Sequence, residues 1–348
     1  MLLYVIILLI LVVGGMTAKG KNEFFTDYLC PKNTSTINAI FSVLIFLSHG
    51  VQYVTLNGPL DAPYFALRSF LGQIVVVTYL FFSGYGIMES ITKKGKAYVK
   101  AMPWNRFFGL WYQFAIVVIL YVLTNLAVGK NMTVKNILLA FTGYTSLGNS
   151  NWYLFATFML YAIVYLAFML AGKRRFIGVL ITCALSVVYV VVLIETKWLP
   201  ARFYNTFLCF PLGMAYSYCK PKVDAFLMKN DGMWIATFVC TLTAFLYCSE
   251  NRTDSRGMEL AFYLLSVLVI VLFMMKVQIR STVLDWFGSH IFSFFILQRI
   301  PMIALKQLGF ASKPHFFLVI CFFATVLMAT FFDLFIGKCN SLIFKKKV

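Results

Sequence analysis

Acidic residues are scarce in this chain. Only 12 Asp and Glu occur among 348 residues, charged residues amount to 12%, and histidine occurs three times. A soluble domain carries about 25% charged residues, so an ordinary globular protein is excluded. The 30 Lys and Arg give a formal net charge of +18, which in a soluble protein would indicate a nucleic-acid partner. In so apolar a chain we expect no nucleic-acid partner and treat the charge as a topology signal.

Several catalytic and structural patterns are also missing. The eight cysteines include no CxxC pair and no metal-ligand spacing, and most of them lie within apolar runs. We therefore expect neither a disulfide framework nor a metal site. There is no GxSxG nucleophile elbow, so a covalent acyl-serine mechanism at Ser48 or Ser83 is disfavoured.

Long hydrophobic runs account for most of the sequence. Hydrophobic residues make up 61% of the chain, in runs of roughly 20 residues, the length that crosses a hydrocarbon core about 30 Å thick. The predicted spans are 2–18, 37–56, 70–88, 107–128, 151–171, 176–195, 203–218, 233–249, 258–275, 286–305 and 315–336. These runs predict an all-α fold, a polytopic transmembrane helical bundle in the lipid bilayer. It would have about ten core helices plus an N-terminal hydrophobic anchor helix.

The basic residues are distributed unevenly around these spans. If the loop 89–106 is cytoplasmic, alternation places 20 Lys and Arg on the cytoplasmic side and nine on the other. Cytoplasmic loops of membrane proteins are enriched in Lys and Arg. We therefore expect a multi-pass protein of the cell membrane, the inner or plasma membrane, with a cytoplasmic C-terminus.

Two apolar segments differ from the predicted core spans. Residues 1–22 are expected to be an uncleaved anchor rather than a signal peptide, because Lys19 and Lys21 follow the apolar stretch and no basic region precedes it. Residues 137–150 are too short to span and are expected to form a re-entrant or interfacial half-helix.

His49 is the one histidine expected deep in a span. It lies 12 residues into the predicted span 37–56, roughly 18 Å along a helix, whereas His290 and His315 lie at expected interfaces. An imidazole at this depth either packs between helices as a satisfied polar group or acts as a general base. Gly50 follows it directly and would let a substrate approach the backbone closely.

Two further patches place polar residues in apolar surroundings. The third span ends with TYLFFSGYGIME, which contains Ser83, Gly84 and Tyr85. Its glycines lack side chains, so another backbone or a ligand can approach the helix closely. FSFFILQRIPM in the tenth span contains Gln298 and Arg299. Arg299 either extends to the outer interface or faces a substrate path.

Together these motifs resemble the integral-membrane acyltransferase-3 family, over roughly residues 36 to 336. The family's first motif is an Arg with a His eleven positions later, and INAIFSVLIFLSH has His49 but Asn38 in place of the Arg. YLFFSGYG resembles the second motif. Arg106 in KKGKAYVKAMPWNRFFGLWY and Trp152 in NSNWYLFATFMLY resemble two more. In the C-terminal motif Gln298 stands where His is common.

The resemblance implies an acetyl-CoA-dependent O-acyltransferase. Such enzymes move an acyl group, most often acetyl, to a hydroxyl of a cell-envelope or exopolysaccharide sugar. Acetyl-CoA or another acyl-CoA would be a co-substrate rather than a bound cofactor, and the partners would be a glycan acceptor and polysaccharide-assembly machinery. The acyltransferase domain would cover 23–348, with His49 catalytic. The residues expected to bind donor or substrate are Asn38, Ser83, Gly84, Tyr85, Arg106, Trp152, Gln298 and Arg299.

Two other functions remain open from the sequence. A transporter or exporter of a glycan or lipid-linked sugar would suit a bundle with few buried charges, and the loss of the Arg at Asn38 favours it. Transporters often have paired broken helices in two related halves, and the sequence has no such symmetry. A non-catalytic partner of a polysaccharide machine is the third alternative.

Overall fold

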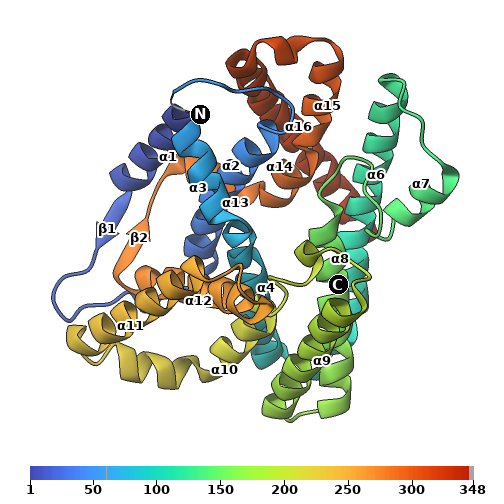
Figure 1. Ribbon diagram of the computed structural model, residues 1–348. Coiled ribbons are helices and arrows are strands. Elements are labelled where there is room, and N and C mark those ends of the chain that lie inside the picture. The colour runs from blue at the N-terminus through green and yellow to red at the C-terminus, as the bar shows by residue number, and fades with distance from the viewer. Residues whose placement is uncertain (60, 345–348) are drawn as a thin grey trace.

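The computed structural model describes residues 1–59 and 61–344, and α-helices dominate this part of the chain (Figure 1). The helices are α1 Leu2–Gly14, α2 Pro31–Gly50, α3 Ala62–Leu71, α4 Ile74–Lys94, α5 Lys96–Met102, α6 Gly109–Ala127, α7 Val134–Ala140, α8 Asn151–Ala171, α9 Arg175–Thr196, α10 Cys209–Leu227, α11 Asp231–Glu250, α12 Arg256–Lys276, α13 Thr282–Ser289, α14 Ile291–Leu297, α15 Arg299–Gln307 and α16 Pro314–Ile343. A π-helical turn, η1 Pro103–Phe108, joins α5 to α6, and short 3₁₀ turns η2 Ala201–Phe203 and η3 Phe310–Ser312 precede α10 and α16.

Seven described helical segments are long and apolar enough to cross a membrane, or eight if one bent pair counts as a span. The seven are Ala62–Lys94, Lys96–Ala127, Asn151–Ala171, Arg175–Thr196, Asp231–Glu250, Arg256–Lys276 and Pro314–Ile343. The all-α transmembrane bundle is therefore confirmed. The other predicted spans also contain helices, but α1 has only 13 residues, and α2 and α10 fall outside the apolar set.

The span predicted at 286–305 is not a single straight helix. The chain bends by 73° between Thr282–Ser289 and Ile291–Gln307. At the bend, His290 Nδ1 lies 2.8 Å from the Trp286 carbonyl oxygen and 3.0 Å from Ser289 Oγ, so a local side-chain bond competes with the helical ladder. A second break separates α14 from α15 at Gln298.

The expected half-helix at 137–150 is helical only as far as Ala140, the end of α7. Gly143 and Gly148 then adopt φ values of 76° and 112°, which side chains with a Cβ rarely tolerate. The rest of the segment is a loop that returns to the start of α8.

A two-stranded antiparallel sheet was not expected from the sequence. Strand β1 Met16–Ala18 pairs with β2 Val277–Ile279, with Met16 opposite Ile279. The pairing holds the segment after α1 against the segment after α12 (Figure 1). Strand β2 lies in a loop predicted to be cytoplasmic, and β1 ends the predicted span 2–18 at the start of another such loop. The tail lysines Lys345, Lys346 and Lys347 lie outside the described residues.

Helices α4 and α10 pack closely through glycines. A Cβ at Gly84 would overlap the Phe210 carbonyl oxygen, and one at Gly213 would overlap the Phe81 carbonyl oxygen. This contact fixes α4, whose opposite side lies toward α2 and the site described next.

Candidate active site

A polar cavity of about 450 Å³ borders His49 and is called the His49 cavity below. Its walls come from the end of α2, from α3 and the start of α4, from the loop before α8, from η2 and from α14 and α15. Most of the side chains that line it are polar, and among the described residues no carboxylate does so. A polar space able to form hydrogen bonds thus adjoins the imidazole.

The two ring nitrogens of His49 have different surroundings. Nε2 lies 3.4 Å from Ser150 Oγ, whereas Nδ1 is buried without a hydrogen-bond partner in the described chain. The Gln298 side chain lies beside the ring. Gln298 is fully buried, its Nε2 donates to the Phe295 carbonyl at 2.7 Å, and its Oε1 is unpaired among the described residues. Both His49 Nδ1 and Gln298 Oε1 lack a partner in the described chain, and a bond between them would satisfy both atoms and leave Nε2 as the acceptor.

Three arginines also line the His49 cavity. Arg68 of α3 donates from Nε to Ser48 Oγ at 2.9 Å. Arg299 of α15 donates from Nη2 to Gln52 Oε1 at 3.0 Å, and its buried Nε has no partner within the described part of the chain. Arg202 of η2 is exposed. No ion pair joins any of the three to a described carboxylate.

The loop before α8 supplies further polar groups. Asn149 Oδ1 accepts from the Leu147 N–H at 3.1 Å, and Ser146 Oγ donates to the Asn149 carbonyl at 2.6 Å. Asn149 Nδ2 is left buried and unpaired within the described residues, as is Gln73 Oε1 on another wall. Orphaned buried polar atoms cost free energy, so their concentration here is a feature of a binding site.

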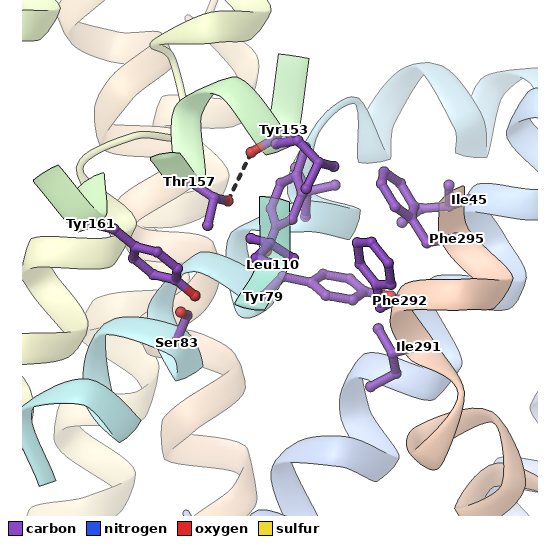
Figure 2. Close-up of a pocket in the computed structure, with 12 residues that line it drawn as sticks. Ile45, Tyr79, Ser83, Leu110, Tyr153, Thr157, Tyr161, Ile291, Phe292 and Phe295 are labelled. Carbon is purple, nitrogen blue, oxygen red and sulfur yellow. Dashed lines mark hydrogen bonds between the residues drawn. The ribbon is translucent and has the colours of Figure 1, made fainter. Parts of the chain in front are cut away.

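A smaller apolar pocket of about 140 Å³ adjoins the His49 cavity and is called the tyrosine pocket below (Figure 2). Its lining includes Tyr79, Tyr153 and Tyr161, and the Tyr161 hydroxyl points toward Ser83. The residues that line both spaces are Ile45, Val76 and Phe295. The two spaces therefore lie on either side of a thin apolar wall.

Four of the predicted site residues are grouped at the His49 cavity. They are His49, Trp152, Gln298 and Arg299; Gln298 lies behind the imidazole and the other three line the cavity. Ser83 lines the tyrosine pocket instead.

The other four predicted residues lie elsewhere. Asn38 is three turns from His49 along α2, its backbone carbonyl accepts from the Tyr79 hydroxyl at 2.8 Å, and its side-chain oxygen is buried and unpaired in the described chain. Gly84 forms the α4–α10 contact. Tyr85 lies on that same side of α4, away from the tyrosine pocket. Arg106 donates from Nε to the Tyr98 hydroxyl at 2.9 Å.

Sequence reasoning missed several residues of the cavity. Arg68 and Arg202 were counted only as charges of outer loops, and Asn149 and Ser150 only as part of a short apolar segment. A usable signal was present in TSLGNSN, where polar residues crowd immediately before an apolar helix.

Most of the chain, including the His49 cavity, is similar to a known protein family. A family model described as "Acyltransferase domain" matches residues 36–333, which contain every residue that lines the His49 cavity. No curated protein and no solved structure matches the chain. The match covers well over half of the sequence and a helical bundle with membrane-spanning segments. The chain therefore belongs to the acyltransferase-3 family of membrane acyltransferases.

Proposed function

We propose that the protein transfers an acyl group, acetyl in the first instance, from acyl-CoA to a hydroxyl of a cell-envelope or exopolysaccharide sugar. The observation that supports this most directly is the His49 imidazole at a polar cavity, with Nε2 near Ser150 and the Gln298 side chain beside the ring. An imidazole held in this way is suited to general-base catalysis.

The proposed reaction is a direct transfer. Nε2 of His49 takes the proton of the acceptor hydroxyl while that oxygen forms a bond to the thioester carbonyl carbon. The carbon–sulfur bond then breaks, and the departing thiolate takes the proton from the imidazolium. The products are the ester and the free CoA thiol. Gln298 Oε1 would hold Nδ1–H throughout and keep the ring in one orientation.

The developing oxyanion needs hydrogen-bond donors. Asn149 Nδ2 is a buried donor at the cavity that lacks a partner among the described residues. Such preorganised donors stabilise an oxyanion most strongly where water is excluded. Asn38 lies too far along α2 to share this role, and Tyr85 lies on the α10 side of α4.

The tyrosine pocket supports a route for the acyl donor. It extends from the wall beside His49 toward Ser83, at the middle of α4, the helix that ends at Lys93 and Lys94. An extended thioester arm would occupy this apolar pocket, and the loop lysines would attract the donor's phosphates. Those lysines are equally what the positive-inside rule predicts, so the support comes from the pocket.

The test measures transfer of label from acetyl-CoA into the glycan fraction of membranes that contain the protein. His49→Ala should lower the rate by about 10²–10⁴-fold, the usual contribution of a general base. His315→Ala is the matched control, because His315 lies at the start of α16, outside the His49 cavity.

Two outcomes would contradict the proposal. If His49→Ala and the unaltered protein label the glycan equally, His49 is not the general base. If no label enters the glycan with either protein, and the glycan crosses the membrane only when the protein is present, the protein is an exporter.

A further inference from the structure

The His49 cavity gathers positive charge without a negative partner. Arg68, Arg202 and Arg299 all line it, while no carboxylate does so in the described part of the chain. Holding like charges around one partly enclosed space is unfavourable, because the interior screens them less than water does. In most proteins such arginines pair with Asp or Glu. Here an anion from outside the chain would complete the site.

The arginines retain donors for such an anion. Arg299 Nε is buried and unpaired within the described residues, and Arg68 uses Nε for Ser48, with no bond from its two terminal nitrogens in that part of the chain. A planar guanidinium binds carboxylate or phosphate through two parallel hydrogen bonds, which selects these groups over chloride or a neutral hydroxyl.

We infer that the hydroxyl acceptor is itself an anion, a sugar or polyol unit that carries a carboxylate or a phosphate. This inference rests on the proposed acyl transfer and specifies its acceptor. The anionic group lies among the three guanidinium groups, and the hydroxyl to be acylated is presented to His49 Nε2. Arg202 is exposed, so it makes the first contact as the acceptor enters.

The alternative anion is the phosphate of the acyl donor, and the geometry disfavours it. Arg68 and Lys94 lie toward opposite ends of the helical segment Ala62–Lys94, which is long enough to cross the membrane. A donor whose phosphates lie near Lys93 and Lys94 therefore reaches the cavity only with its acyl end. The arginines remain free for the acceptor.

The test is equilibrium binding to the full-length protein in lipid nanodiscs, with labelled glucuronate, glucose 6-phosphate and glucose as probes. At least one anionic sugar should bind roughly tenfold or more tightly than glucose, the scale of a hydrogen bond to a charged group. Arg202→Met should abolish most of that preference without changing glucose binding. Arg202→Lys should restore part of it.

Arg256→Met is the matched control, because Arg256 is exposed outside the cavity and pairs with Glu259. It should leave the binding of all three sugars unchanged. Preference for glucuronate would identify a carboxylate in the acceptor, and preference for glucose 6-phosphate would identify a phosphate. Equal binding of the three sugars, or binding of neither anion, would overturn the inference.

Two further measurements separate this inference from the proposed function. If Arg202→Met weakens the binding of labelled CoA instead, the arginines bind the donor and the inference is wrong. Acyl transfer to glucose that exceeds transfer to both anions would also overturn it, while leaving the acyltransferase intact. Anion binding without any acyl transfer would instead preserve the anion site and refute the proposed reaction.

Discussion

Among the single residues of this site, Gln298 has the most direct influence on the chemistry proposed for His49. It lies in the break between α14 and α15, and its side chain lies beside His49. Its amide nitrogen is already bonded to Phe295, which orients the amide and leaves the oxygen as the free acceptor. The imidazole tautomer would thus be set by an amide rather than by a carboxylate.

Gln298→Leu is expected to lower kcat roughly ten- to hundredfold, about the value of one hydrogen bond at a reacting group. KM for acetyl-CoA should stay near its original value, because Gln298 does not line the cavity. Gln298→Glu keeps an acceptor oxygen and should recover much of the rate. Steady-state kinetics of the three proteins test this. A change in KM alone would contradict a positioning role.

At this scale the sequence named His49, Trp152, Gln298 and Arg299 as candidates but did not single out Arg68 or Arg202. A histidine far inside an apolar run can be recognised from the sequence alone. Burial of an imidazole in a membrane is costly, so its presence there indicates a function. Arg68 and Arg202 are separated by more than a hundred residues and look like ordinary loop charges. Their convergence depends on how α3 and η2 pack, which no local pattern specifies.

Among the helices, the α4–α10 contact fixes the wall that borders both spaces. The Gly84 and Gly213 positions let two backbones approach until only hydrogen fits between them. Close approach of this kind is how membrane helices gain packing energy, since lipid offers no hydrophobic driving force between them. Gly84 therefore supports the site through packing rather than through contact with a substrate.

Gly84→Ala is expected to destabilise the protein by about 1–3 kcal/mol through overpacking against Phe210. Gly86→Ala on the same helix is the matched control, because a Cβ there meets no atom within 4 Å. It should be neutral or stabilise by about 0.5–1 kcal/mol, as alanine does in a helix. Thermal unfolding in detergent measures both. Equal behaviour of the two variants would contradict the close contact.

Helix existence was predicted better than helix continuity. Length and hydropathy identify most spans because the bilayer imposes both. At the break within 286–305 the His290 side chain contacts the Trp286 carbonyl, and the loop at 141–150 contains glycines with positive φ. The bend and the loop depend on local hydrogen bonds and backbone angles, which average hydropathy does not reflect. Each borders the His49 cavity or leads to it.

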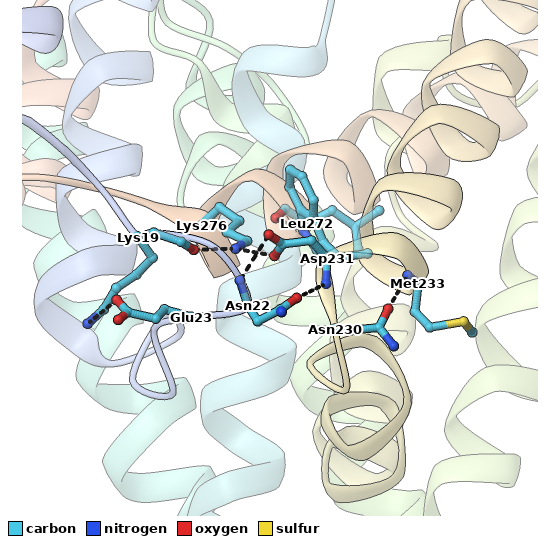
Figure 3. A network of polar contacts seen from close by, with 10 residues as sticks. Lys19, Asn22, Glu23, Asn230, Asp231, Met233, Leu272 and Lys276 are labelled. Atoms are coloured by element: carbon cyan, nitrogen blue, oxygen red, sulfur yellow. Dashed lines mark hydrogen bonds and ion pairs between the residues drawn. The ribbon is translucent and has the colours of Figure 1, made fainter.

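At the scale of the whole molecule, a polar network ties the N-terminal segment to the last third of the chain (Figure 3). Lys276 Nζ donates to the Gly20 carbonyl at 3.0 Å and pairs with Asp231. The Asn22 N–H donates to Asp231 Oδ2 at 2.9 Å, and Asn22 Oδ1 accepts from the Asp231 N–H at 2.8 Å. With the β1–β2 pair, these bonds place residues 16–23 and the start of α11 at one end of the bundle.

The charge distribution predicts that this end is cytoplasmic, together with the C-terminus. In a background with the eight native cysteines replaced by alanine, Lys94→Cys should react with a membrane-impermeant maleimide only after permeabilisation. Lys197→Cys, in the loop after α9, should react in intact cells. The reverse pattern would invert the topology and place the arginines of the His49 cavity on the cytoplasmic side.

The wall formed by Ile45, Val76 and Phe295 has an electrical consequence. Water and anions reach one side of it, and the space on the other side is lined mainly by apolar and aromatic groups. An ion that entered this constriction would lose its hydration shell, at a cost of several kcal/mol. The wall would therefore prevent ions from passing between the two spaces, so the protein can keep a polar cavity without becoming an ion channel.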